Sequence, residues 1–315
     1  MLALKPHPQF RPKSKRLPKV KTMTIAAGFP CSDGLILCAD TQETIYTYAK
    51  VNTEKMRQLE TPLYNVVFTG AGDSGLLEMS AQLMEQALLR ENPNVDREIE
   101  RVLRDTWLEI FNRHLAPYSR FPSDERPNPD LLIGVQYPTA AEFYRAYGTA
   151  FWHVREPQCV GTGVVLGKSL IAQLFDNSMT IRQGWLVALY VLHQAKTWVD
   201  GCGGNTDILL LSCQNKLITR IPTTEVKELE EHFDQFNAYV HPLFISAADR
   251  STSQSRFDEQ MKQFRLDMLA LRGKFMEFEE FAKHLYALTG IPIPTDDGIT
   301  PQEPSPPDSS QSGKP

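Results

Sequence analysis

The first strong hydrophobic pattern along the chain lies at residues 24–41, where two apolar runs are separated by a Ser-Asp-Gly turn. Apolar runs of this length on either side of an Asp-Gly turn predict a β-hairpin whose strands are covered on both faces. Residues 51–58 and 64–69 are predicted as further strands. The folded part of the chain therefore begins with a group of strands.

Apolar residues next recur at helical spacing over residues 76–88 and again over about 96–111, which predicts two amphipathic helices. On the first of them, the polar face opposite the apolar one consists of Glu78, Gln82, Glu85 and Gln86. Pairs of helices placed between groups of strands indicate helices outside stacked sheets, and periodicity alone predicts an α+β fold. The remaining elements are predicted as strands at 130–136 and 142–147, helices at 165–175 and 181–199, and strands at 208–212 and 216–221.

The pattern changes after residue 222, where a charged helix is predicted to about residue 236 and a long helix over 254–288. Apolar residues of the long helix alternate at spacings of four and three over four heptads, which is the pattern of a coiled-coil stripe. This stripe either covers the chain's own domain or packs against another subunit. It consists of Phe257, Met261, Phe264, Met268, Leu271, Phe275, Phe278, Ala282 and Leu285.

The two ends of the chain have the composition of disordered segments. Residues 1–22 carry seven basic residues, four prolines and no acidic residue, and the last 25 residues are rich in Pro, Ser, Asp and Gln. The predicted organisation is a basic arm at 1–22, a domain at 23–222, a helical extension at 223–290 and a disordered tail at 291–315.

Charge and composition exclude several classes of protein. Outside residues 1–22 the chain has 26 basic and 38 acidic residues, which argues against a nucleic-acid-binding body. The sequence has no apolar stretch long enough to cross a bilayer and no secretory signal at its start, so we expect a cytoplasmic protein without membrane contact. Five cysteines without a Cys-x-x-Cys pair and seven scattered histidines predict reduced thiols, no metal site and no cofactor.

Several short motifs follow one another in an order that narrows the class. Thr24-Ile25-x-x-Gly28 is followed by an Asp-Gly turn and an apolar run that ends at Asp40-Thr41. Thr53-Glu54-Lys55, residues 65–72, residues 159–163 and residues 200–204 come next. This order resembles the proteasome β subunits, which are threonine peptidases of the N-terminal-nucleophile hydrolase class. The resemblance covers about residues 24–221 and implies a four-layer αββα sandwich, to which the C-terminal helical segment is added.

The same resemblance implies a role for each of seven residues. Thr24 would be the nucleophile, with its own α-amine as the base. Lys55 would lower the pKa of its surroundings, and Asp40 would position Lys55 by a charge-assisted hydrogen bond. The backbone N–H of Gly72 would stabilise the oxyanion. The positions at which the family carries a serine, an aspartate and a serine that organise the amine are Thr162, Asp200 and Cys202.

The function implied is a threonine-type peptidase that cleaves peptide bonds in peptides or unfolded proteins, as a homo-oligomer with an ATPase as a candidate partner. Because 23 residues precede Thr24, its nitrogen is an amide unless Met23 is the initiator and is removed. The family usually has glycine before the nucleophile, and the gap from Asp200 to Cys202 is shorter than the family's. A competing alignment places Met23 itself at the nucleophile position, which would give a catalytically silent structural subunit of a proteasome-like ring.

A second class of function rests on residues 162–169, Thr-Gly-Val-Val-Leu-Gly-Lys-Ser. This stretch matches a phosphate-binding P-loop except at its first position, where Thr162 stands in place of glycine. The residues before it form a poor buried strand for such a motif. Nucleotide binding is therefore the weaker alternative.

Overall fold

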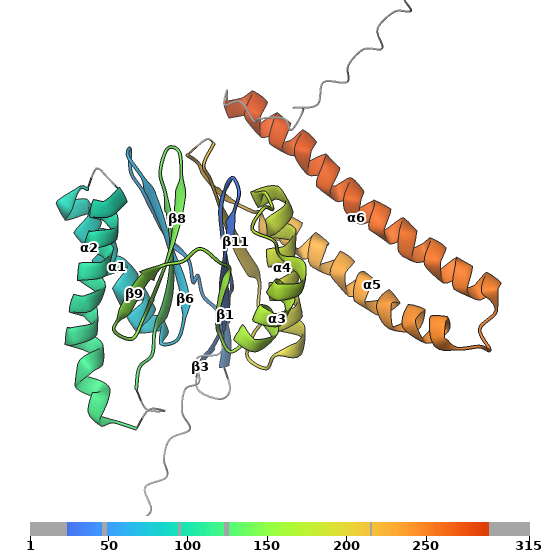
Figure 1. Ribbon diagram of the computed structural model, residues 1–315, viewed down its shortest axis with the longest axis horizontal. Helices are drawn as coiled ribbons and strands as arrows, with labels where there is room; N and C mark the ends of the chain where they lie inside the picture. The colour runs from blue at the N-terminus through green and yellow to red at the C-terminus, as the bar shows by residue number, and fades with distance from the viewer. Residues whose placement is uncertain (1–23, 46–48, 94–95, 123–125, 215, 290–315) are drawn as a thin grey trace, which may run out of the picture. The chain divides into compact units, whose positions relative to one another are not determined.

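The computed structural model describes residues 24–45, 49–93, 96–122, 126–214 and 216–289. The segments 1–22 and 291–315, for which the sequence predicts disorder, lie outside the described residues, as does Met23. The chain divides into two compact units, Met1–Ala238 and Tyr239–Pro315. The first unit is a mixed α/β structure with antiparallel sheets (Figure 1).

The first sheet is built on the predicted hairpin, which is confirmed. Its two strands are β1 (Ile25–Cys31) and β2 (Gly34–Asp40), paired with Cys31 opposite Gly34. All seven residues of β2 are buried, as expected for a strand covered on both faces. The order of the five strands is β10-β1-β2-β11-β12, in which β10 is Gln158–Gly161, β11 is Thr206–Ser212 and β12 is Ile218–Arg220.

The second sheet also has five antiparallel strands, in the order β5-β6-β7-β8-β9. They are β5 (Arg57–Glu60), β6 (Asn65–Ala71), β7 (Asp130–Gln136), β8 (Ala141–Tyr147) and β9 (Ala150–His153). The two sheets are stacked closely, because a Cβ atom on Gly28 of β1 would collide with the ring of Phe143 on β8, and one on Gly134 with Leu35 of β2. Glycine at these two positions keeps the sheets close.

The single strand predicted over residues 51–58 is wrong. A separate ribbon, β3 (Gln42–Ile45) with β4 (Ala49–Asn52), ends at Asn52, and β5 begins only at Arg57. Residues 53–56 lie between them outside any strand, and Thr53 N donates to Thr41 O over 2.8 Å. The chain turns here from one sheet to the other, which a run of alternating residues does not reveal. Sequence analysis also missed β9, whose residues are mostly exposed and carry no buried face.

Helices cover both sheets, as Figure 1 shows. Helices α1 (Ser74–Glu91) and α2 (Asp96–Ile110) pack on the second sheet, with Met84 and Trp107 fully buried in the shared core. A π-helical turn (Phe111–Leu115) and a 3-10 turn (Ala116–Arg120) follow α2. On the other side, α3 (Val164–Leu174) contacts β10, and α4 (Ile181–Trp198) contacts β1, β2 and β11. The helix pairs predicted from periodicity are confirmed.

The remaining helices are α5 (Thr223–Ala248), which crosses the division between the two units, and α6 (Gln254–Thr289). The prediction that the first of them ends near residue 236 is wrong, because α5 continues through Pro242 to Ala248. On α6, Met261 and Met268 of the coiled-coil stripe are 43% and 40% exposed. The side chains of Phe275, Phe278, Ala282 and Leu285 lie outside the described residues.

Candidate active site

The hairpin brings Thr24 and Asp40 together. Thr24 directly precedes β1 and Asp40 ends β2, and the pairing of Ala26 with Ala39 places these two chain positions side by side. The hydroxyl of Thr24 donates a hydrogen bond to Asp40 Oδ1, which also accepts from the backbone N–H of Ile25 at 3.1 Å. Asp40 is fully buried and Thr24 is nearly so. A carboxylate is thus fixed beside a threonine hydroxyl.

Lys55 completes this group from the segment between β4 and β5. Its Nζ donates to Asp40 Oδ1 at 2.7 Å, to the backbone oxygen of Gln42 at 2.5 Å, and to the hydroxyl oxygen of Thr24. The ammonium therefore has one acceptor for each of its three N–H bonds. A positive charge in contact with Thr24 Oγ1 stabilises negative charge on that oxygen, which is the condition for a nucleophilic hydroxyl.

The turn at residues 200–204 supports Asp40 from the opposite side. The backbone N–H of Gly203 donates to Asp40 Oδ2 at 2.9 Å, and the N–H of Asn205 donates to Thr41 Oγ1 at 2.8 Å. Gly201 has φ +91° and Gly204 has φ +73°, values that favour glycine, so this tight turn depends on its glycines. The resemblance pointed to this segment, but the acceptor of the Gly203 amide could not be read from sequence.

Of the three residues expected to organise the amine, Thr162 contacts Thr24, and Cys202 lies near Asp40 and Lys55, which both contact Thr24. The backbone N–H of Thr162 donates to the backbone oxygen of Thr24 at 2.8 Å, while the Thr162 side chain is exposed. Cys202 is buried, and burial, with the charge of Asp40, raises its pKa to about 12. Its thiol is therefore neutral at pH 7. Asp200 is exposed, and no hydrogen bond or ion pair within the described part of the chain links it to Thr24.

Gly72, the expected oxyanion donor, lies directly after β6. Its φ of +120° favours glycine, and a Cβ atom there would collide with the backbone oxygen of Asn128. The preceding residue, Ala71, and the backbone of Thr24 both lie against Gly161 of β10. The end of β6 therefore lies near Thr24, which is the neighbourhood that an oxyanion donor requires.

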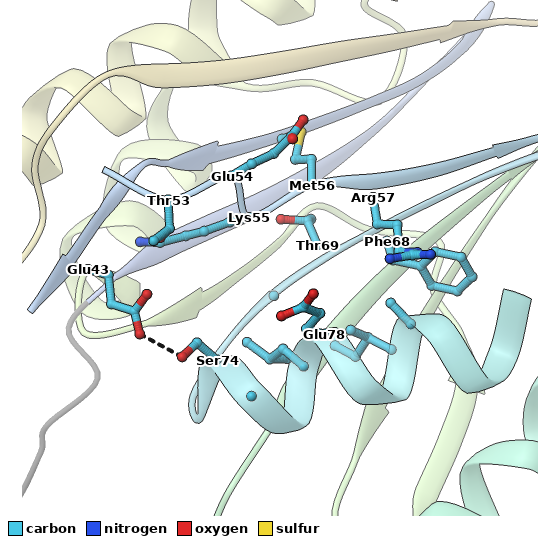
Figure 2. A pocket seen from close by; sticks show the side chains of 15 residues that line it. Glu43, Thr53, Glu54, Lys55, Met56, Arg57, Phe68, Thr69, Ser74 and Glu78 are labelled. Carbon is cyan, nitrogen blue, oxygen red and sulfur yellow. Dashed lines mark hydrogen bonds between the residues drawn. The ribbon is translucent and has the colours of Figure 1, made fainter. Parts of the chain in front are cut away.

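A cavity of about 410 Å³ lies beside this group and includes Lys55 in its lining (Figure 2). Its walls come from β3, residues 53–57, residues 68–70 of β6, the first half of α1 and Leu131 of β7. No pattern in the sequence indicates this cavity. Glu78, on the predicted polar face of α1, lines the cavity, and Glu85 Oε2 accepts a hydrogen bond from Arg57 Nε at 2.5 Å. Periodicity separates the two faces of a helix and does not show which polar residues border a hollow.

The stretch proposed as a near P-loop does not form a loop. Helix α3 begins at Val164, so Gly167 and Lys168 lie inside the helix, and a Cβ atom on Gly167 would meet the sulfur of Cys159. Glycine at this position serves close packing of the helix. Among the residues that the structure describes, no group of three or more His, Cys, Asp or Glu side chains is arranged to hold a metal ion. None of the described helices is both long and apolar enough to span a membrane.

Comparison with known proteins identifies the class of fold. No family model matches the chain. The proteasome subunit alpha of Methanobrevibacter smithii is 20% identical over 208 residues, which is 66% of this chain and 80% of the relative. The proteasome subunit alpha of Methanococcus maripaludis is 23% identical over 211 residues, 67% of this chain and 78% of the relative.

Solved structures with a similar fold are also proteasome-like proteins. Anbu (ancestral beta-subunit) from Yersinia bercovieri superposes with a TM-score of 0.58 and 16% identity, covering 70% of this chain and 97% of that one. The helical assembly of the Anbu complex from Pseudomonas aeruginosa gives a TM-score of 0.59 and 14% identity, covering 74% and 99%. The chain has a proteasome-like fold of the N-terminal-nucleophile type. The proteasome-like fold expected from the order of motifs is thereby confirmed.

Proposed function

We propose that this chain is a proteasome-like threonine peptidase of the β type, which cleaves peptide bonds through Thr24. The observation that carries the proposal is the contact of the Lys55 ammonium with Thr24 Oγ1, held in place by Asp40 and by the backbone of Gln42. A partly buried lysine and a fully buried aspartate that both contact one threonine hydroxyl form the kind of charged group that activates a nucleophile. The stacked sheets and their helix pairs are then the four-layer αββα sandwich of this hydrolase class.

The chemistry follows from a free Thr24. Its α-amine takes the hydroxyl proton as Oγ1 attacks the carbonyl carbon of the peptide bond, and the carbonyl electron pair moves to oxygen. The N–H of Gly72 donates to this oxyanion. Collapse of the intermediate breaks the C–N bond, and the leaving amine takes the proton from the α-ammonium. Water then attacks the ester, and the α-amine transfers the proton of water back to Oγ1, releasing a carboxylic acid.

Lys55 and Asp40 act on this sequence electrostatically. The ammonium stabilises the charge that develops on Oγ1, and the buried carboxylate fixes the ammonium. The neutral thiol of Cys202 and the backbone of Thr162 border the same residue, where they can orient the amine, although a thiol is a weak hydrogen-bonding group. Asp200 would join them only after the turn that carries it rearranges around a free amine.

The experiment that tests this function is intact-mass measurement and N-terminal sequencing of the protein from its native host. A preparation that begins at Thr24 and reacts with an N-terminal-threonine-directed epoxyketone supports the peptidase. Finding residues 1–23, or Met23 alone, on every molecule overturns it, because an amide nitrogen cannot act as the base.

A second candidate function is a catalytically silent structural subunit of a proteasome-like ring. The observation in its favour is that the sequence relatives are named alpha subunits, which are non-catalytic. The charged group around Thr24 would then be a remnant. The same measurement separates the two, because a silent subunit has no need for a free N-terminus at position 24.

Assembly and partners follow from the same proposal. The Anbu complex of Pseudomonas aeruginosa is a helical assembly, and a proteasome-like role here entails an oligomer of this chain. Its substrates would be peptides or unfolded proteins in the cytoplasm, delivered by an ATPase where they are folded. Co-purification of an ATPase with the native oligomer tests the last point.

A further inference from the structure

The cavity beside Lys55 has the position of a substrate pocket. Lys55 lines the cavity and also contacts Thr24 Oγ1, so the cavity adjoins the residue that would attack the substrate. A side chain of a bound peptide next to the scissile bond would therefore enter it. Its volume of about 410 Å³ lies in the range of small-ligand pockets, which is about 300–1,000 Å³.

The cavity is lined by two cations and three carboxylates, and only some of these charges have a partner of opposite sign. Its two cations are both paired with carboxylates that do not line it: Lys55 with buried Asp40 at 2.7 Å, and Arg57 with Glu85 at 2.5 Å. Of its three carboxylates, only Glu54 has a cation of its own, because Arg220 Nη2 lies 2.7 Å from Glu54 Oε1.

Two carboxylates remain without a cation. Glu43 Oε1 accepts a hydrogen bond from the neutral hydroxyl of Ser74 at 2.6 Å. Glu78 lies one helical turn after Ser74 on α1. In Figure 2 its carboxylate lies between this helix and Thr69. The ion pairs of the described residues include none to Glu43 or Glu78. The cavity therefore carries an excess of negative charge.

Besides its charged residues and the hydroxyls of Thr53, Thr69 and Ser74, the wall has an apolar part. It consists of the side chains of Met56, Phe68, Leu77, Ala81 and Leu131. A cavity lined by apolar side chains and by carboxylates without a cation matches a lysine or arginine side chain, whose methylene stem packs on apolar surface while its cationic head reaches the anions. A carboxylate side chain would meet like charges, and a short apolar one would leave Glu43 and Glu78 uncompensated.

We propose that this pocket receives a lysine or arginine side chain of the substrate, on the acyl side of the bond cleaved. The proposal rests on the peptidase function proposed above. Glu43 and Glu78 are the residues that determine this specificity. Arg57 also lines the pocket, and its positive charge would weaken this preference if it were not paired with Glu85.

The test compares peptide amides that carry one fluorogenic leaving group and differ only in the residue before it: arginine, citrulline, leucine or glutamate. Citrulline has the shape of arginine without its charge. We expect kcat/KM for arginine to exceed that for citrulline by about tenfold or more, as for a hydrogen bond to a charged group. Glutamate should be the poorest substrate.

The variants are Glu78→Gln and Glu43→Gln, either of which suffices if the other does not fold. Each should lower kcat/KM for the arginine peptide by about tenfold and leave that for the citrulline peptide unchanged. Glu91→Gln is the matched control, because Glu91 ends the same helix, pairs with Arg101 and does not line the cavity. Equal rates for arginine and citrulline peptides overturn the proposal and leave the peptidase function intact.

A binding measurement separates failure of the pocket from failure of the enzyme. Fluorescence anisotropy would follow the full-length protein with two labelled peptides that end in arginine or in citrulline. If no peptide is cleaved but the arginine peptide binds more tightly in a manner that Glu78→Gln removes, the pocket proposal holds and the peptidase function fails. If neither cleavage nor a difference in binding is found, both are overturned.

Discussion

The carboxylate of Asp40 and the backbone N–H of Gly203 are joined by a hydrogen bond of 2.9 Å between positions 163 residues apart in the chain. Asp40 ends β2, and Gly203 lies in the turn that leads into β11, the neighbour of β2 in the sheet. This turn contributes to the site by holding a carboxylate with a main-chain group. The position of Lys55 then depends on both segments.

Replacement of Asp40 by asparagine should destabilise the fold as well as abolish peptidase activity. The substitution leaves the Lys55 ammonium, whose side chain is only 16% exposed, without its anion, and breaking a buried pair in this way costs about 3–5 kcal/mol of unfolding free energy. Denaturant unfolding measures the loss. The control is Glu109→Gln, in the exposed pair with Arg113 at 2.7 Å, for which a change within about 0.5 kcal/mol is expected. Similar losses in both variants would show that the Asp40 pair is not stabilising.

Thr24→Ala should remove activity and labelling by an epoxyketone, because no hydroxyl remains at the position before β1. Thr24→Ser is the matched variant, since it keeps the hydroxyl that Asp40 and Lys55 contact. It should retain measurable turnover. Mass spectrometry of the labelled protein gives the readout, and turnover by the alanine variant would place the nucleophile at another residue.

Gly161→Ala should reduce both stability and activity more than alanine does at another glycine with positive φ. Gly161 has φ +96°, and a Cβ atom there would collide with the backbone oxygen of Thr24. Gly148 supplies the control: its φ is +56°, and nothing lies within 4 Å of an added Cβ. We expect Gly148→Ala to cost about 1–2 kcal/mol through backbone strain alone. Gly161→Ala should cost more and also reduce kcat/KM, and equal effects of the two changes on both quantities would refute this.

The buried cysteines predict a fall in stability at high pH. Burial raises the pKa of Cys159 from its ordinary value of 9.0 to about 12. Between these values the unfolded chain loses the thiol proton and the folded chain keeps it, so the free energy of unfolding falls as pH rises from 9 to 12. The measurement is chemical unfolding at pH 8 to 11 for the protein and for Cys159→Ala, which removes one such group. A slope identical in the two proteins would contradict the prediction.

The exposed methionines of α6 predict a role in assembly. Met261 and Met268 occupy alternate positions of the heptad stripe and are 43% and 40% exposed, so a double change of both to glutamate should lower the mass of the native oligomer. Leu266→Glu is the control, because Leu266 is 50% exposed and lies on the opposite side of the helix from the stripe. Light scattering after size-exclusion chromatography measures the mass. An unchanged mass in the double variant would assign the stripe to the chain itself.

Sequence patterns predicted the parts of the site that are formed by neighbouring residues. They did not predict the parts formed by contacts between segments far apart in the chain. The hairpin, and with it the proximity of Thr24 to Asp40, follows from two apolar runs and an Asp-Gly turn. Lys55 was expected on a strand, but it lies in a segment between strands, which is why its side chain can reach across to the first sheet. The cavity is formed by several segments that lie far apart in the chain, and no periodicity describes a space between elements.

The three hydrogen bonds of the Lys55 ammonium set a limit on what this residue can do. Each N–H bond is already directed at a fixed oxygen, on Thr24, Asp40 or Gln42. None is left for a water molecule or for a substrate atom, so Lys55 is suited to be a stationary charge and not a carrier of protons. In the proposed mechanism the group that moves the hydroxyl proton is the α-nitrogen of Thr24 itself. Cleavage of the chain before Thr24 would then activate the site without any movement of the side chains of Thr24, Asp40 and Lys55.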